Sequence, residues 1–145
     1  MLTVREMKME DLDRVSALEA SVFSMPWSRE GFAASLSGPD GMFLVVEEEE
    51  TVIGYCGMIV SVEEGEITNV AVDPAARRKG TGDMLIREAI RRAQAKGIER
   101  IVLEVRVSNH AAIHLYEKNG FVTVGTRKGF YEKPREDALV MIYGQ

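Results

Sequence analysis

One carboxylate in the second half of the chain has the type and position of a general base. Residues 101–107 alternate with a period of two, which predicts a strand with apolar side chains on one face and Glu104 on the other. A carboxylate in the middle of a strand, near the centre of a sheet, can accept a proton from a reacting group. The same pattern also fits a surface glutamate that pairs with Arg106.

A basic, glycine-containing segment offers a second kind of chemistry. Residues 77–82 read Arg-Arg-Lys-Gly-Thr-Gly and stand just before the strongest helical pattern in the chain. The unpaired N–H groups and positive end of a helix start can hold an anion. A P-loop is excluded because no Lys-Ser/Thr follows the second glycine, and a dinucleotide fingerprint is excluded because Leu85 stands at its third glycine. A diphosphate site remains, beside the alternative of an ordinary tight turn.

The periodicities predict the elements that must position these residues. Helices are expected over 10–23, 28–36, 81–96 and 109–118. Strands are expected over 2–7, 42–46, 51–60, 66–72, 101–107, 121–126 and 138–143. The resulting order is β-α-α-β-β-β-α-β-α-β-β, which predicts an α/β (α+β) protein whose second to fourth strands are antiparallel neighbours.

Length and composition indicate one globular domain, residues 1–145. The chain is 46% hydrophobic and 28% charged, and its length is sufficient to bury a normal core. The first ten residues are too charged for a signal peptide, and no run approaches the roughly 20 apolar residues of a membrane span. We therefore expect a cytoplasmic protein without a membrane partner. Cys56 is the only cysteine, and it is either a small buried apolar group or a nucleophile.

Charge is distributed unevenly along the chain. The formal net charge is −5, yet residues 77–100 hold eight basic and three acidic residues. An acidic body with one basic segment suits a local anionic ligand better than a nucleic acid, whose extended backbone it would repel. The alternative is a solvated helix face. His110 and His114 lack a third ligand at a suitable spacing, so no metal site is expected.

These motifs together resemble those of a known enzyme family. A strand ending in Val70-Ala71-Val72-Asp73-Pro74, then Arg-x-x-Gly-x-Gly, then a helix, resembles the pyrophosphate motif of the GNAT family of N-acetyltransferases. Residues 24–28, 103–109, 111–117 and 136–138 resemble the ribosomal-protein-alanine N-acetyltransferases within that family, and the similarity spans nearly the whole chain. The resemblance implies the acyl-CoA N-acyltransferase fold, with a mixed, mostly antiparallel sheet split between two parallel strands.

The resemblance also implies substrates and residue roles. The cosubstrate would be acetyl-CoA and the acceptor the N-terminal alanine of small-subunit ribosomal protein eighteen. Glu104 would accept a proton and Tyr116 would donate one, although a tyrosine at that helix position can also be a plain core anchor. Asn109 could bind the pantetheine arm or only cap its helix. The implied cofactor contacts are Val70, Ala71, Val72, Arg77, Arg78, Lys79, Gly80, Thr81, Gly82, Asp83 and Asn109.

The acceptor site is the part that the sequence describes least. Trp27 and Tyr131 are candidates for its wall, and ordinary packing is the alternative for each. The sequence departs from the family pattern at Thr81, where an aliphatic residue is common, and at Gly129-Phe130-Tyr131, where paired tyrosines are common. Two other functions stay open at this point: an acetyltransferase for small amines, and an acyl-CoA sensor without catalysis.

Overall fold

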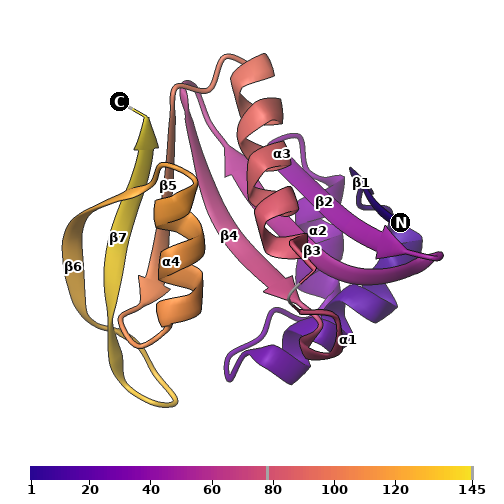
Figure 1. The fold of residues 1–145 in the computed structure, drawn as a ribbon, viewed down its shortest axis with the longest axis horizontal. Helices are drawn as coiled ribbons and strands as arrows, with labels where there is room; N and C mark the ends of the chain where they lie inside the picture. Colours follow the sequence, from indigo (N-terminus) through magenta and orange to yellow (C-terminus); the bar gives the residue numbers. More distant parts are fainter. Residues whose placement is uncertain (78, 145) are drawn as a thin grey trace.

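The computed structural model describes residues 1–77 and 79–144 (Figure 1). Its strands are β1 Leu2–Glu6, β2 Gly41–Glu48, β3 Thr51–Val60, β4 Glu64–Val72, β5 Arg100–Arg106, β6 Val122–Tyr131 and β7 Glu136–Gly144. Its helices are α1 Leu12–Val22, α2 Arg29–Ser37, α3 Thr81–Ala95 and α4 His110–Lys118, with short 3₁₀ turns at Met9–Asp11 and Pro74–Ala76. The predicted order of elements is confirmed. β6 runs further than predicted, since it continues to Tyr131.

The seven strands form one sheet in the order β1-β2-β3-β4-β5-β7-β6. Every neighbouring pair is antiparallel except β4 and β5, which are parallel. The predicted fold class, a mixed and mostly antiparallel sheet with one parallel pair, is therefore confirmed.

The parallel pair is joined over only a short length. Glu64 to Glu66 of β4 pair with Arg100 to Val102 of β5. Beyond this point the two strands separate, and Figure 1 shows the gap widening toward their carboxyl ends. A shift in the β3–β4 register lies just past the junction, where Met58 pairs with Ile67 and Gly57 with Asn69. Since β3 pairs with the other side of β4, the edge of β4 that faces β5 is left without a strand partner.

Two apolar cores lie on opposite faces of the sheet. Helices α1 and α2 cover one face, where Phe32 packs with Tyr55. Helices α3 and α4 cover the other, around Leu85 and Leu103. β2 and β3 are buried on both faces, which explains their nearly continuous apolar sequences. None of the helices described within 1–77 and 79–144 combines the length and hydrophobicity that a membrane-spanning helix needs.

Candidate active site

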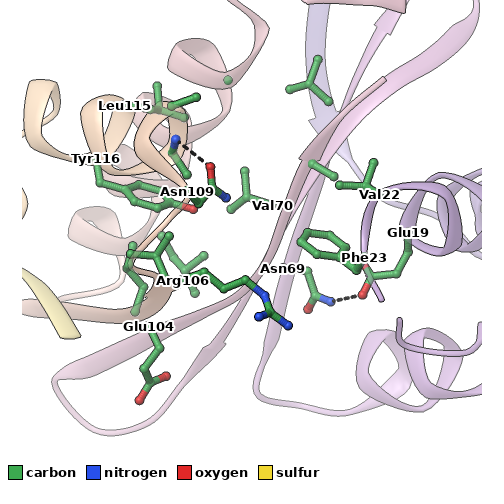
Figure 2. A pocket seen from close by; sticks show the side chains of 18 of the residues that line it. Glu19, Val22, Phe23, Asn69, Val70, Glu104, Arg106, Asn109, Leu115 and Tyr116 are labelled. Carbon is green, nitrogen blue, oxygen red and sulfur yellow. Dashed lines mark hydrogen bonds between the residues drawn. The ribbon is translucent and has the colours of Figure 1, made fainter. Parts of the chain in front are cut away.

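A cleft of about 720 Å³ occupies the space between the separating strands β4 and β5. One wall comes from β4 and from the segment that joins α1 to α2, and the other from β5, α4 and the turn between β6 and β7. The start of α3 closes one end. Figure 2 shows side chains from both walls, with Tyr116 and Asn109 on one side and Glu19 and Phe23 on the other.

The start of α3 presents open backbone groups to the cleft. Gly80 precedes the helix with φ of 79°, a left-handed conformation that glycine adopts without strain, and no side chain within residues 1–77 and 79–144 caps the helix. The first N–H groups of a helix have no partner within it. The Oγ1 atom of Thr81 is buried and also has no hydrogen-bond partner among the described residues. Free amides beside an orphaned hydroxyl fit a diphosphate.

The charged side chains around this helix start have different surroundings. Arg77 lines the cleft, whereas Lys79 does not and pairs instead with Glu48 on β2 at 2.8 Å. The Asp83 carboxylate lies 3.0 Å from Arg87 and accepts a hydrogen bond from Asn119 at 2.9 Å, which ties α3 to α4. Its side chain therefore has a structural partner already. Arg78, also predicted as a contact, lies outside the described residues.

The unpaired edge of β4 forms the adjoining part of the cleft. Val70, Ala71 and Val72, the predicted cofactor contacts on β4, all line it. Val70 and Val72 pack toward the α3–α4 core, whereas Ala71 belongs to the α1–α2 core, so the edge separates two compartments. Alternate backbone N–H and C=O groups along an unpaired strand edge are available to a ligand.

Glu104 lies on β5 with the orientation that the sequence predicts. Its neighbours Leu103 and Val105 are buried in the core, while Glu104 lines the cleft with 17% of its side chain exposed. Its ionic partner is Arg127, at 3.4 Å. The alternative of a pair with Arg106 is wrong, because Arg106 binds Glu136 at 3.1 Å.

Tyr116 is a core residue that also borders the cleft. It is 7% exposed, its ring packs on Phe121 at 5.7 Å between centroids, and it lines the cleft. Figure 2 shows the ring extending across the cleft beside Asn109. Burial, with the nearby Cys56 and Tyr131, raises the pKa of Tyr116, so the phenol is protonated at neutral pH.

Asn109 is the N-cap of α4, which confirms one of the two alternatives. Its Oδ1 accepts a hydrogen bond from the Ala112 N–H at 3.2 Å. Asn109 also lines the cleft, and the cap does not use its amide nitrogen. Capping and ligand binding are therefore compatible at this residue.

Trp27 and Tyr131, the candidates for the acceptor wall, both line the cleft. Trp27 packs on Phe32 at 5.2 Å and also lines the cleft. Tyr131 lines it too, with the Arg106 guanidinium 4.4 Å from its ring centre. Burial, followed by the charge of Glu104, raises the pKa of Tyr131 to about 12. Packing and contact with the cleft thus coexist at both residues.

Among the cleft residues that were not predicted, Arg106, Glu19 and Asn69 form polar contacts within its walls. Arg106 donates to the backbone carbonyls of Glu132 and Pro134, both at 2.9 Å, and so fixes the β6–β7 turn. Glu19, only 3% exposed, accepts a hydrogen bond from Asn69 at 3.2 Å. Glu19 stands beside Leu18 on the apolar stripe of its helix, which hints at burial, but no sequence pattern connects it to a residue so far along the chain.

Comparisons with known proteins agree with this architecture. Residues 10–121 match the model of the Acetyltransferase (GNAT) family. A relative from Bacillus subtilis (strain 168) is provisionally named [ribosomal protein bS18]-alanine N-acetyltransferase. It is 41% identical to this chain over 139 residues, and the match covers 95% of this chain and 92% of the relative.

Solved structures have the same fold. The ribosomal-protein-S18-alanine N-acetyltransferase of Escherichia coli superposes with a TM-score of 0.92 at 31% identity, over 99% of this chain and 94% of the other. Arabidopsis thaliana NAA60 in complex with acetyl-CoA shares the fold at 18% identity, with a TM-score of 0.90 over 99% and 98% of the two chains. From the matched segment and these relatives, the chain belongs to the GNAT family of acetyltransferases.

Proposed function

We propose that this enzyme transfers the acetyl group of acetyl-CoA to the N-terminal alanine amine of ribosomal protein bS18. The observation that carries the proposal is a single cleft that connects an open helix start to a carboxylate and a phenol on its opposite wall. The names of the bacterial relatives supply the acceptor. The acidic net charge outside residues 77–100 is compatible with a basic peptide.

Acetyl-CoA supplies an activated acetyl thioester, and the chain supplies a place for each of its parts. The amides of Gly80 to Asp83, with Thr81 Oγ1 and Arg77, would hold the diphosphate. The open edge of β4 at residues 70–72 and the amide nitrogen of Asn109 would hold the pantetheine arm. Backbone N–H groups of the same edge would also stabilise negative charge on the reacting carbonyl oxygen.

Glu104 would act as the base. An α-amino group has a pKa of roughly 8, so about a tenth of it is free amine at neutral pH. Glu104, directly or through water, would take the proton that the amine loses. Trp27 and Tyr131 would form the wall that holds the peptide next to it.

Tyr116 would act as the acid, giving its proton to the departing thiolate. Its raised pKa keeps that proton in place until transfer. The acetyl group would pass directly to the amine, because Cys56 is unsuited to carry it. Cys56 is 1% exposed, and burial raises the pKa of its thiol to about 12, so little thiolate exists at neutral pH.

Thiol release from acetyl-CoA tests this function directly. The acceptors are a peptide with the bS18 amino terminus, the same peptide with its amine blocked, and a panel of free amines. We expect turnover with the unblocked peptide alone. Glu104→Gln should lower kcat by about 100-fold. Glu66→Gln is the matched control, since Glu66 is an exposed carboxylate on the facing strand, and it should retain turnover.

Each other outcome points elsewhere. Turnover with free amines alone would contradict the proposed acceptor and indicate a small-molecule acetyltransferase. Binding of acetyl-CoA without turnover on any acceptor would indicate a sensor. Equal losses in the Glu104→Gln and Glu66→Gln enzymes would contradict the assignment of Glu104 as the base.

A further inference from the structure

A buried carboxylate that the proposed chemistry does not use lies in one wall of the cleft. Glu19 on α1 accepts hydrogen bonds from the Tyr55 hydroxyl at 2.5 Å, the Trp27 backbone N–H at 3.0 Å and Asn69 Nδ2 at 3.2 Å. No Lys, Arg or His forms a salt bridge with it among the described residues. Its three donors join α1, β3, β4 and the segment between the first two helices.

This carboxylate determines the orientation of Asn69. Asn69 Nδ2 donates to Glu19, so the amide nitrogen faces this carboxylate and the amide oxygen faces away. Figure 2 shows this arrangement, with the nitrogen bonded to Glu19. Asn69 is 5% exposed and lines the cleft, yet its Oδ1 has no donor among the described residues. A buried carbonyl oxygen without a donor costs free energy that a ligand's N–H would recover.

The position of Asn69 indicates which ligand carries that N–H. Val70 and Val72 face the α3–α4 core, beside the open helix start, whereas Asn69 bonds to α1 and Ala71 packs with the α1–α2 core. Asn69 is thus on the side of the β4 edge opposite to the diphosphate end. Trp27, a candidate for the acceptor wall, donates its backbone N–H to the same Glu19 oxygen that accepts from Asn69.

We propose that Asn69 Oδ1 accepts a hydrogen bond from an N–H group at the amino end of the acceptor peptide. The inference rests on the proposed function and adds a binding residue to it. The donor is either the α-amine or the first peptide N–H. The Glu19 carboxylate polarises the amide and strengthens its oxygen as an acceptor. The same oxygen repels phosphate and carbonyl oxygens, which are acceptors too.

Kinetics of Asn69→Ala test the inference. We expect KM for the bS18 peptide to rise roughly tenfold while KM for acetyl-CoA stays unchanged, since one hydrogen bond to the peptide is lost. Tyr55→Phe is the matched control. It removes the bond to the other oxygen of Glu19 and leaves the bond to Asn69, so it should lower Tm without raising the peptide KM to the same extent. Asn69→Leu, close in volume to asparagine, repeats the measurement if the alanine variant does not fold.

A depsipeptide, with an ester in place of the first peptide bond, identifies the donor. If Asn69 accepts the first peptide N–H, the KM of the wild type should be roughly tenfold higher for the depsipeptide than for the peptide. The Asn69→Ala enzyme should then have the same KM for both acceptors. If Asn69 accepts the amine N–H, replacing the peptide bond by an ester should change the KM of both enzymes by the same factor. Both results support the inference.

Two results would overturn it: an unchanged peptide KM in both Asn69 variants, or a rise in the KM for acetyl-CoA instead. Failure of the proposed function is recognised separately, because the wild type itself would then not acetylate the peptide.

Discussion

The two ends of the cleft are built in different ways. The proposed diphosphate end comes from one short stretch of the chain, Arg77 and residues 80–83, whose contribution is mostly backbone N–H groups at a helix start. The proposed acceptor end is formed by side chains from α1, the α1–α2 segment, β4, β5 and the β6–β7 turn. A site made of backbone depends on local chain geometry, whereas a site made of side chains depends on contacts between distant elements. The two ends should therefore respond differently to substitution.

The largest effect is expected where the two ends meet. Tyr116→Phe should lower kcat by about 100-fold or more, because the thiolate would leave without its proton donor. Both KM values and Tm should change little, since the ring and its packing on Phe121 are kept. Steady-state kinetics and thermal unfolding measure these quantities.

Tyr143→Phe is the control for that experiment, because Tyr143 also packs on Phe121 but is not among the residues that line the cleft. It should retain full turnover. Equal activity of the Tyr116→Phe and wild-type enzymes would remove Tyr116 from the mechanism and leave it a core anchor.

A pair of glycines at the two ends of α3 tests the backbone-built end. Gly80 and Gly97 have φ of 79° and 81°, and a Cβ at either would meet nothing within 4 Å. Alanine at each position should therefore cost a similar free energy of unfolding, about 1–2 kcal/mol. Only Gly80→Ala should raise KM for acetyl-CoA, by roughly tenfold, because it distorts amides that face the diphosphate.

Titration of acetyl-CoA binding by calorimetry checks this difference. The peptide KM at saturating acetyl-CoA should be the same for both glycine variants. A similar loss of acetyl-CoA affinity in Gly97→Ala would mean that helix stability, rather than the geometry of the helix start, controls binding.

A smaller effect is expected from the side-chain-built end. Arg106 holds the β6–β7 turn through Glu132, Pro134 and Glu136, and its guanidinium covers Tyr131. Arg106→Ala should raise the peptide KM by several-fold, which is about the effect of losing one charged hydrogen bond. The KM for acetyl-CoA should stay unchanged. Arg100→Ala, which breaks an exposed pair with Glu64 at the other end of β5, should change neither KM. An altered KM for acetyl-CoA in Arg106→Ala would show that the two ends are not independent.

The same difference between the two ends determines what could be predicted from the sequence. The order of elements, the strand face of Glu104 and the helix start after Gly80 follow from periodicity and local motifs, and the structure agrees. The partner of Glu104 was not readable, because Arg127 comes from a strand whose register with β7 contains two irregularities. Glu19 and Asn69 are separated by 50 residues, and only the packing of α1 against β4 brings them together.

The smallest effect expected is the dependence of stability on pH, which should be seen at the acceptor end before the diphosphate end. Hydrogen bonding from Ser108, then from Arg106, lowers the pKa of Glu136 in the folded chain. The ionised Glu136 carboxylate therefore stabilises the folded chain above pH 4.5, the ordinary pKa of this group. The stabilisation is lost as the pH falls through the lowered pKa of the folded state. Glu136→Gln should be less stable than the wild type at about pH 7, and the difference should shrink as the pH falls below 4.5 and through the lowered pKa.

Urea unfolding across this pH range measures this difference, and hydrogen exchange locates it. Acidification should increase exchange in the β6–β7 turn before it does so in the first turn of α3, because backbone N–H groups do not titrate in this range. A constant difference between the two proteins at all pH values would mean that the Glu136 side chain stabilises the turn by packing. In that case the acceptor end would not depend on an ionised carboxylate. The two ends would then differ only in how far apart in the sequence their residues lie.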